Sequence, residues 1–127
     1  MLVAGLVLAG IAALLHVYIF VLESVRWEAS RTRGIFGTSA EEAAATKQLA
    51  YNQGFYNLFL AIGTFVGVAL VAADQRAVGA TLVIACAGSM ALAAAVLVTS
   101  SRERLRSALV QGLAPLLGVV LVVAGLV

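Results

Sequence analysis

The sequence predicts an all-α, polytopic membrane protein, in which a four-helix transmembrane bundle makes up a single domain (residues 1–127). Hydrophobic residues make up 63% of the 127 residues and the mean hydropathy is +1.09, which is more apolar surface than a soluble domain of this size can bury. The apolar residues fall into four stretches, at about 2–25, 50–73, 77–98 and 107–127. Each has ~20–24 residues, enough to cross a hydrocarbon layer of ~30 Å as a helix. None alternates apolar and polar residues as a membrane strand does.

The first stretch is predicted to be a retained helix, because residues 1–5 lack the positive charge of a cleaved signal peptide. Residues 26–49 form the first connection. Within it, residues 31–37 are predicted to form an irregular turn with glycine hinges at Gly34 and Gly37. Ser39 and Glu42 then match an S-x-x-E capping box, which predicts a helix start. This helix should form a cytoplasmic extension of two or three turns and continue into the second span.

Small residues in the second span and a proline in the last span predict features of helix packing. Gly63 and Gly67 form a G-x-x-x-G pattern in the second span, which favours close helix contacts within the bundle or between two copies. Pro115 predicts a kink in the last span. Cys86, the only cysteine, is expected to be a buried apolar side chain. Because four short helices make a thin bundle, we also expect a homo-oligomer.

The basic residues predict the orientation of the chain. Seven of the eight lie in the first and third connections, against one, Arg76, in the second: Arg26, Arg31, Arg33, Lys47, Arg102, Arg104 and Arg106. By the positive-inside rule the first and third connections face the cytoplasm and both termini lie outside. The expected location is the plasma membrane, with lipid as partner. The net charge of +2 does not indicate nucleic-acid binding, because these charges form no basic face.

Polar side chains in or next to the spans form the predicted ligand-binding site. Ionisable and amide groups are costly in a bilayer, so they indicate a functional site by default. His16 and Glu23 are seven residues apart, which in a regular α-helix places them on one face with a rise of ~10 Å. In the predicted orientation all these groups fall in the cytoplasmic half, which predicts one shared polar cavity. The residues are His16, Glu23, Trp27, Asn52, Gln53, Tyr56, Asn57 and Gln111.

The sequence also leaves a structural explanation open for each of them. Glu23 could pair with Arg26 or Lys47, and His16 could be a neutral histidine bonded to one amide across the bundle. The amides of the second span could be hydrogen-bonding contacts between helices. Only their joint placement on one side of the membrane favours a site.

Several motifs resemble one family of membrane proteins. They are H-V-Y-I-F-V-L-E at residues 16–23 with Trp27 after it, Phe36-Gly37, N-Q-G-F-Y-N at residues 52–57 and Q-G-L-A-P at residues 111–115. Over essentially the whole chain, the sequence is similar to the family named domain of unknown function 1304, which are small four-span membrane proteins. The resemblance implies a four-helix membrane fold. It implies no activity, so no catalytic residue is assigned.

Three functions are compatible with the sequence. The favoured one is binding or transport of a small solute through a cytoplasm-facing polar cavity. The second is a membrane-embedded enzyme on a lipophilic substrate, with His16 or Glu23 as acid or base. The third is an accessory subunit of a larger membrane complex. A single histidine predicts no metal site, and no cofactor motif is present, so neither a metal nor a cofactor is expected. Binding is favoured over catalysis because no nucleophile lies beside a base.

Overall fold

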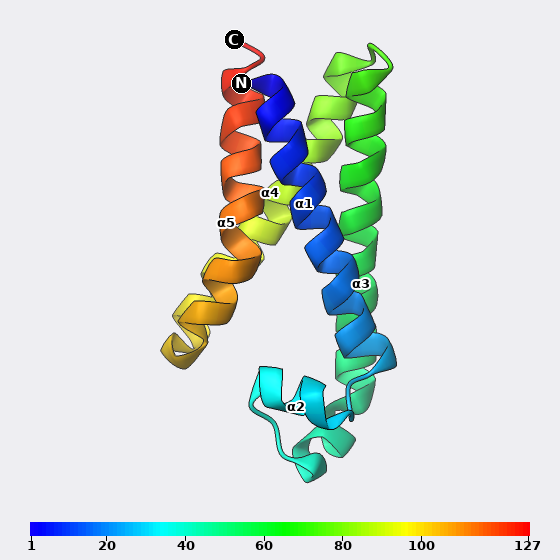
Figure 1. Ribbon diagram of the computed structural model, residues 1–127, viewed down its shortest axis with the longest axis vertical. Coiled ribbons are helices and arrows are strands. Elements are labelled where there is room, and N and C mark those ends of the chain that lie inside the picture. Colours follow the sequence, from blue (N-terminus) through cyan, green and yellow to red (C-terminus); the bar gives the residue numbers. More distant parts are fainter.

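A computed structural model describes all residues, 1–127, and contains only helices and their connections (Figure 1). Five α-helices are joined by two other helical turns, of which η1 is a π-helical turn and η2 a 3-10 turn. Four helical segments are long and apolar enough to cross a membrane, as predicted. In chain order the elements are α1 (Leu2–Phe20), η1 (Val21–Val25), α2 (Ser30–Phe36), α3 (Ala40–Ala72), α4 (Arg76–Ser100), η2 (Arg102–Arg104) and α5 (Leu105–Ala124).

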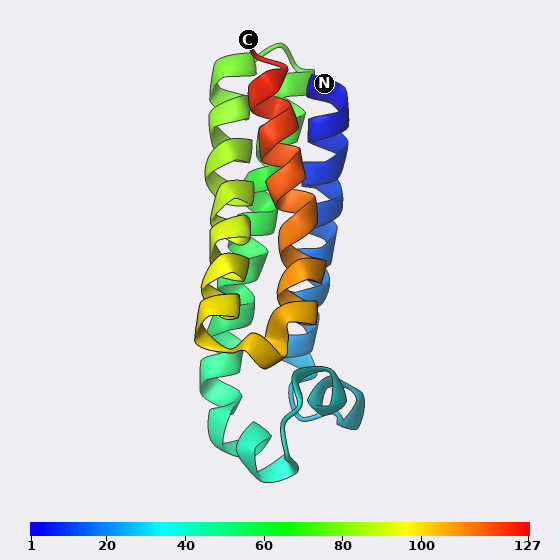
Figure 2. The ribbon, with the colours of Figure 1, turned by 90° about the vertical axis from the view of Figure 1, so that its left-hand side faces the viewer.

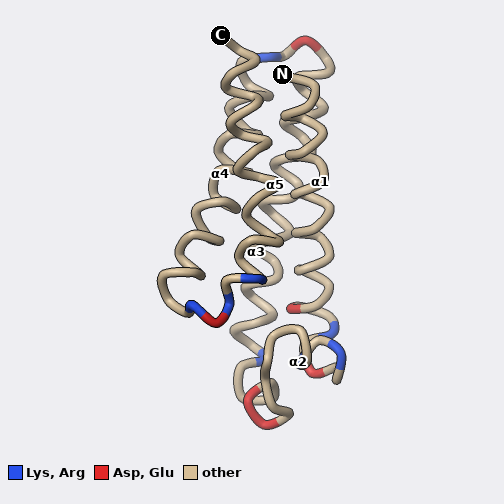
Figure 3. The backbone as a smooth tube through the Cα atoms, turned by 60° about the vertical axis from the view of Figure 1, so that its left-hand side comes forward, with Lys and Arg blue, Asp and Glu red and all other residues tan.

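The four long helices form a ring in the order α1, α3, α4, α5, in which each packs mainly against its two neighbours (Figures 1 and 2). Both termini lie at one end of this bundle, and α2 lies at the other. Nearly all charged residues gather at the α2 end (Figure 3). The positive-inside rule therefore assigns the α2 end to the cytoplasm and both termini to the opposite side.

The helix that contains the second span is longer than a bilayer crossing requires, which agrees with the predicted helical extension. Helix α3 has 33 residues, which corresponds to about 50 Å of helix against a hydrocarbon layer of about 30 Å. Its start is the predicted capping box. Ser39 Oγ accepts a hydrogen bond from the backbone N–H of Glu42 (3.1 Å), and Glu42 Oε2 accepts one from the N–H of Ser39 (2.8 Å). These two bonds satisfy backbone donors that the first turn leaves free.

Glycines bring the helices close together at the end that carries the termini. A Cβ added to Gly67 of α3 would lie 2.8 Å from the carbonyl oxygen of Gly79 of α4, and one added to Gly5 would lie 2.6 Å from the backbone nitrogen of Val122. Gly63, the other half of the G-x-x-x-G pattern, faces Cys86 of α4. This pattern therefore serves packing within the bundle. At the α2 end, by contrast, the pair α4 and α5 leans away from α1 and α3 (Figure 1).

One local prediction was wrong. Residues 31–37 are not an irregular turn, because Ser30–Phe36 forms the short helix α2. Gly34 lies inside this helix and is no hinge, whereas Gly37 ends it with a left-handed φ of 66°. Tertiary contacts explain the helix: Thr32 is buried, and Phe36 packs edge-on against Trp27 with ring centroids 5.0 Å apart. These two anchors are four residues apart and so share one helical face.

Candidate functional site

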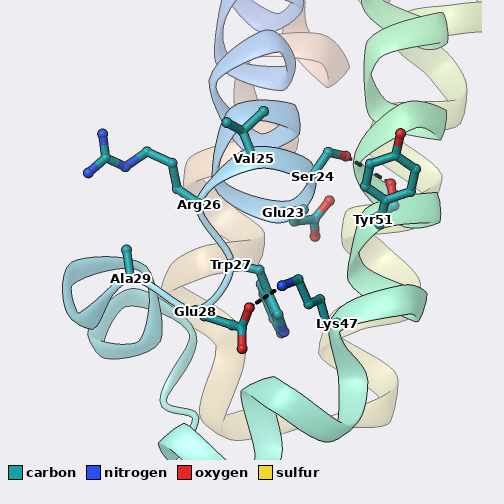
Figure 4. Close-up of a pocket in the computed structure, with 9 residues that line it drawn as sticks. All are labelled: Glu23, Ser24, Val25, Arg26, Trp27, Glu28, Ala29, Lys47 and Tyr51. Carbon is teal, nitrogen blue, oxygen red and sulfur yellow. Dashed lines mark hydrogen bonds and ion pairs between the residues drawn. The ribbon is translucent and has the colours of Figure 1, made fainter.

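A recess of about 440 Å³ opens between η1, the segment that follows it and α3 (Figure 4). It lies at the α2 end of the bundle, where the first span ends and the second begins. We call it the Glu23 recess, after the one acidic residue of the first span. Its lining is Glu23, Ser24, Val25, Arg26, Trp27, Glu28, Ala29, Lys47 and Tyr51.

The wall of this recess that comes from the first span is a π-helical turn. The backbone N–H of Arg26 donates to the carbonyl of Val21, five residues earlier, at 2.9 Å. Such turns are rare, and they occur frequently at functional sites. Because a π turn holds more residues than an α turn, it rotates Glu23 relative to the preceding helix. The regular two-turn spacing predicted between His16 and Glu23 therefore does not hold through this segment.

The Glu23 carboxylate is held by an amide of the neighbouring helix. Asn57 Nδ2 donates to Glu23 Oε2 at 2.8 Å and also to the carbonyl oxygen of Gln53 at 3.2 Å. Glu23 is half-buried and forms no ion pair. The only ion pair of the chain joins Lys47 to Glu28, and Arg26 extends away from α3 (Figure 4). Thus neither of the basic partners considered for Glu23 from the sequence neutralises it.

A second contact fixes the distance between η1 and α3. Ser24 Oγ donates to the backbone carbonyl of Tyr51 at 2.8 Å. Directly above this bond, Gly54 is buried, and a Cβ added there would collide with Ser24 Oγ and lie 3.1 Å from the Ser24 backbone nitrogen. Ser24, Gly54 and Tyr51 are not among the site residues predicted from the sequence. The sequence signal that could have identified them is Gly54 itself, a glycine among the amides of residues 52–57. A glycine at such a position allows another backbone segment to approach the helix closely.

Trp27 joins the segment after the first span to the cytoplasmic part of α3. Its Nε1 donates to the carbonyl oxygen of Ala43 (3.1 Å) and to Thr46 Oγ1 (3.2 Å), while its ring packs against Phe36. The Lys47–Glu28 ion pair lies beside it (Figure 4). Trp27 therefore forms one wall of the Glu23 recess and positions α2 against α3.

The other predicted site residues are distributed differently. His16 is buried in the bundle, where its Nδ1 is 2.8 Å from the carbonyl oxygen of Ala12 in its own helix. Gln111 is half-buried on α5, and its side chain forms no hydrogen bond within the chain. Asn52, Gln53 and Tyr56 are exposed on α3. The structure thus brings together Glu23, Trp27 and Asn57, and joins none of the other five side chains to them by a hydrogen bond.

Asn52 and Tyr56 belong to a second depression, also of about 440 Å³, on the outer face of α3. We call it the aromatic groove. Its lining is Tyr51, Asn52, Phe55, Tyr56 and Phe59. Since Tyr51 lines both depressions, the aromatic groove and the Glu23 recess adjoin on α3.

Comparison with known proteins gives the family of the chain. No curated protein and no solved structure matches it. A family model described as "Protein of unknown function (DUF1304)" matches residues 10–123. This range covers most of the first and last spans, all of the second and third, and every residue of the Glu23 recess and the aromatic groove. Because the match covers most of the chain, this four-span membrane protein belongs to the DUF1304 family.

Proposed function

We propose that this protein binds a small solute in the Glu23 recess, reached from the cytoplasmic side of the plasma membrane. The observation that carries the proposal is a carboxylate at the end of a membrane span, held by Asn57 and neutralised by no basic residue. Such a group is costly at the edge of a bilayer. A bound solute that donates hydrogen bonds or carries positive charge would offset this cost.

The lining supports distinct roles for its residues. Glu23 Oε2 is occupied by Asn57, whereas no group of the chain donates to Oε1. Oε1 is therefore the acceptor left for a solute. Trp27 and Tyr51 add aromatic side chains to the lining of the recess near Glu23 (Figure 4). Asn57 and Ser24 act as positioning residues, because their hydrogen bonds to and from α3 fix where the carboxylate lies.

Thermal unfolding of the purified protein in an uncharged detergent tests this proposal. The probes are methylammonium, choline, acetate and glycerol, so that cationic, anionic and neutral solutes are compared. At a concentration a hundredfold above its Kd, a solute that binds only the folded protein adds about 2.7 kcal/mol to the unfolding free energy. We expect at least one probe to stabilise the wild type and to lose this effect in Glu23→Gln.

Glu103→Gln is the matched control. It also removes one acidic charge from the cytoplasmic end, but from η2, outside the recess. We expect it to respond to the probes as the wild type does. If no probe stabilises the wild type, or if Glu23→Gln responds like the wild type, the proposal is overturned.

Transport would require a second conformation that opens the opposite end. That end is closed here by glycine contacts such as Gly67 against Gly79 and Gly5 against Val122. Uptake of the stabilising probe into proteoliposomes distinguishes transport from binding alone. The enzyme alternative predicts instead a chemically changed lipophilic product that is lost in His16→Ala.

A further inference from the structure

The Glu23 recess and the aromatic groove adjoin at Tyr51, so a polar site and an apolar site lie next to each other on α3. Resting on the proposed function, we infer that the ligand is an organic ammonium amphiphile. Its cationic head binds Glu23, and its single hydrocarbon chain lies along the aromatic groove of α3. Such a ligand enters sideways from the inner leaflet, because both depressions open on the outside of the bundle.

Charge selects a cationic head. Three groups of the recess lining other than Glu23 are charged, but Lys47 and Glu28 neutralise each other and Arg26 points away from α3. Glu23 is therefore the only acidic or basic residue of the lining that faces the cavity without an oppositely charged partner. An ammonium N–H can donate to its free Oε1 in a charge-assisted hydrogen bond. Trp27 and Tyr51 also line the recess, and aromatic rings beside a bound cation contribute cation–π attraction.

The groove selects an apolar chain. Phe55 lies between Tyr51 and Phe59 on α3, with ring centroids 5.0 and 6.1 Å away, and it also contacts Phe20 of α1 at 5.1 Å. From Tyr51 to Phe59 the groove rises about 12 Å along the helix, away from the cytoplasm. This direction carries an alkyl chain from the interface into the hydrocarbon layer. Asn52 is the only amide in the groove, and it lies at the same end as Tyr51.

Trp27 is the only tryptophan of the chain and lines the recess, so its fluorescence reports on head-group binding. The probes are decylammonium, decanol and decyl sulfate at equal mole fractions in maltoside micelles, with methylammonium as the short cation. We expect saturable quenching by decylammonium and at least tenfold weaker binding of decanol and decyl sulfate. Phosphatidylethanolamine is a further probe. It tests whether a membrane lipid, with an ammonium group, a phosphate and two acyl chains, binds better than a single-chain amine.

Two variants separate the head from the chain. Glu23→Gln should weaken decylammonium binding by roughly tenfold or more. Phe59→Ala should weaken it about three- to tenfold, from the loss of an aromatic contact, and leave methylammonium binding unchanged. Glu103→Gln and Phe65→Ala are the controls, because they remove a carboxylate and an aromatic ring that lie outside both depressions. Unfolding temperatures without probe establish that each variant is folded.

The outcomes distinguish this inference from the proposed function. Methylammonium could bind in a Glu23-dependent manner while Phe59→Ala leaves decylammonium binding unchanged. In that case the inferred amphiphilic ligand is wrong, and the proposed binding of a small solute at Glu23 is retained. If decanol or decyl sulfate binds as tightly as decylammonium, the inference that the head group is cationic is overturned. Stronger quenching by phosphatidylethanolamine than by decylammonium overturns the single-chain ligand. If Glu23→Gln changes the binding of none of the probes, both proposals fail.

Discussion

Gly54 sets the distance between the first and second spans at the site. Its missing side chain leaves room for Ser24, whose hydroxyl reaches the carbonyl of Tyr51, and one turn further on Asn57 reaches Glu23. Both hydrogen bonds depend on the same close approach. A single glycine therefore positions the carboxylate that carries the proposed function.

Gly54→Ala is expected to destabilise the protein and the site together. The added Cβ would collide with Ser24 Oγ and lie 3.1 Å from the Ser24 backbone nitrogen, so η1 must move away from α3. We expect a loss of about 1–3 kcal/mol in the unfolding free energy, typical of overpacking, measured in detergent. Gly10→Ala is the control, because nothing lies within 4 Å of its added Cβ. Equal stability of the two variants would contradict this role of Gly54.

Among the elements, the start of α3 depends on local sequence, whereas the π turn η1 depends on tertiary contacts. The start of α3 is determined by the local sequence. Ser39 and Glu42 form hydrogen bonds with each other, and these bonds involve no other part of the chain. The π turn of η1 has no such local signal. It coincides with the bonds that Glu23 and Ser24 form with α3, so tertiary contact accounts for it better than helix propensity does.

Ser39→Ala is expected to loosen the first turn of α3. Loss of an N-cap side chain costs about 1 kcal/mol, and the affected turn lies outside the bilayer. Amide hydrogen exchange should therefore become faster at residues 41–45, while exchange in the spans is unchanged. Ser107→Ala, a serine whose hydroxyl bonds to nothing in the chain, provides the comparison. Unchanged exchange at residues 41–45 would show that the capping box does not hold this helix.

For the whole molecule, charge and packing divide the bundle into two different ends. The end with the termini has few charges and close glycine contacts, whereas the α2 end holds the basic connections and the Glu23 recess (Figures 1 and 3). Basic residues stay in the cytoplasm during insertion. The recess is consequently expected to face the cell interior.

Single cysteines test this orientation. In a Cys86→Ala background, Gln75→Cys lies in the α3–α4 turn and Glu103→Cys in the α4–α5 connection. A membrane-impermeant maleimide added to intact cells should label position 75 and leave position 103 unlabelled until the membrane is opened. The reverse pattern would place the Glu23 recess on the outside and overturn its proposed access route.

Part of the site was predictable because some of its signals are local. Glu23, Trp27 and Asn57 stand out as polar or interfacial groups beside apolar runs, and the structure brings these three together. His16 stands out equally, yet its hydrogen bond goes to its own helix. A sequence shows that a polar group must find a partner in the membrane, but not whether that partner is its own backbone or another helix.

The sequence by itself determined the number of spans, the basic end of the bundle and the start of α3. Each of these depends on hydrophobic length, charge or a cap within one short segment. Only the tertiary structure decided the π turn at Glu23, the helix α2 and the position of the recess beside the aromatic groove. The π turn coincides with contacts between residues about thirty positions apart, such as Ser24 and Tyr51, and α2 is held by the packing of Phe36 against Trp27. Their energies come from contacts between helices, which no single segment encodes.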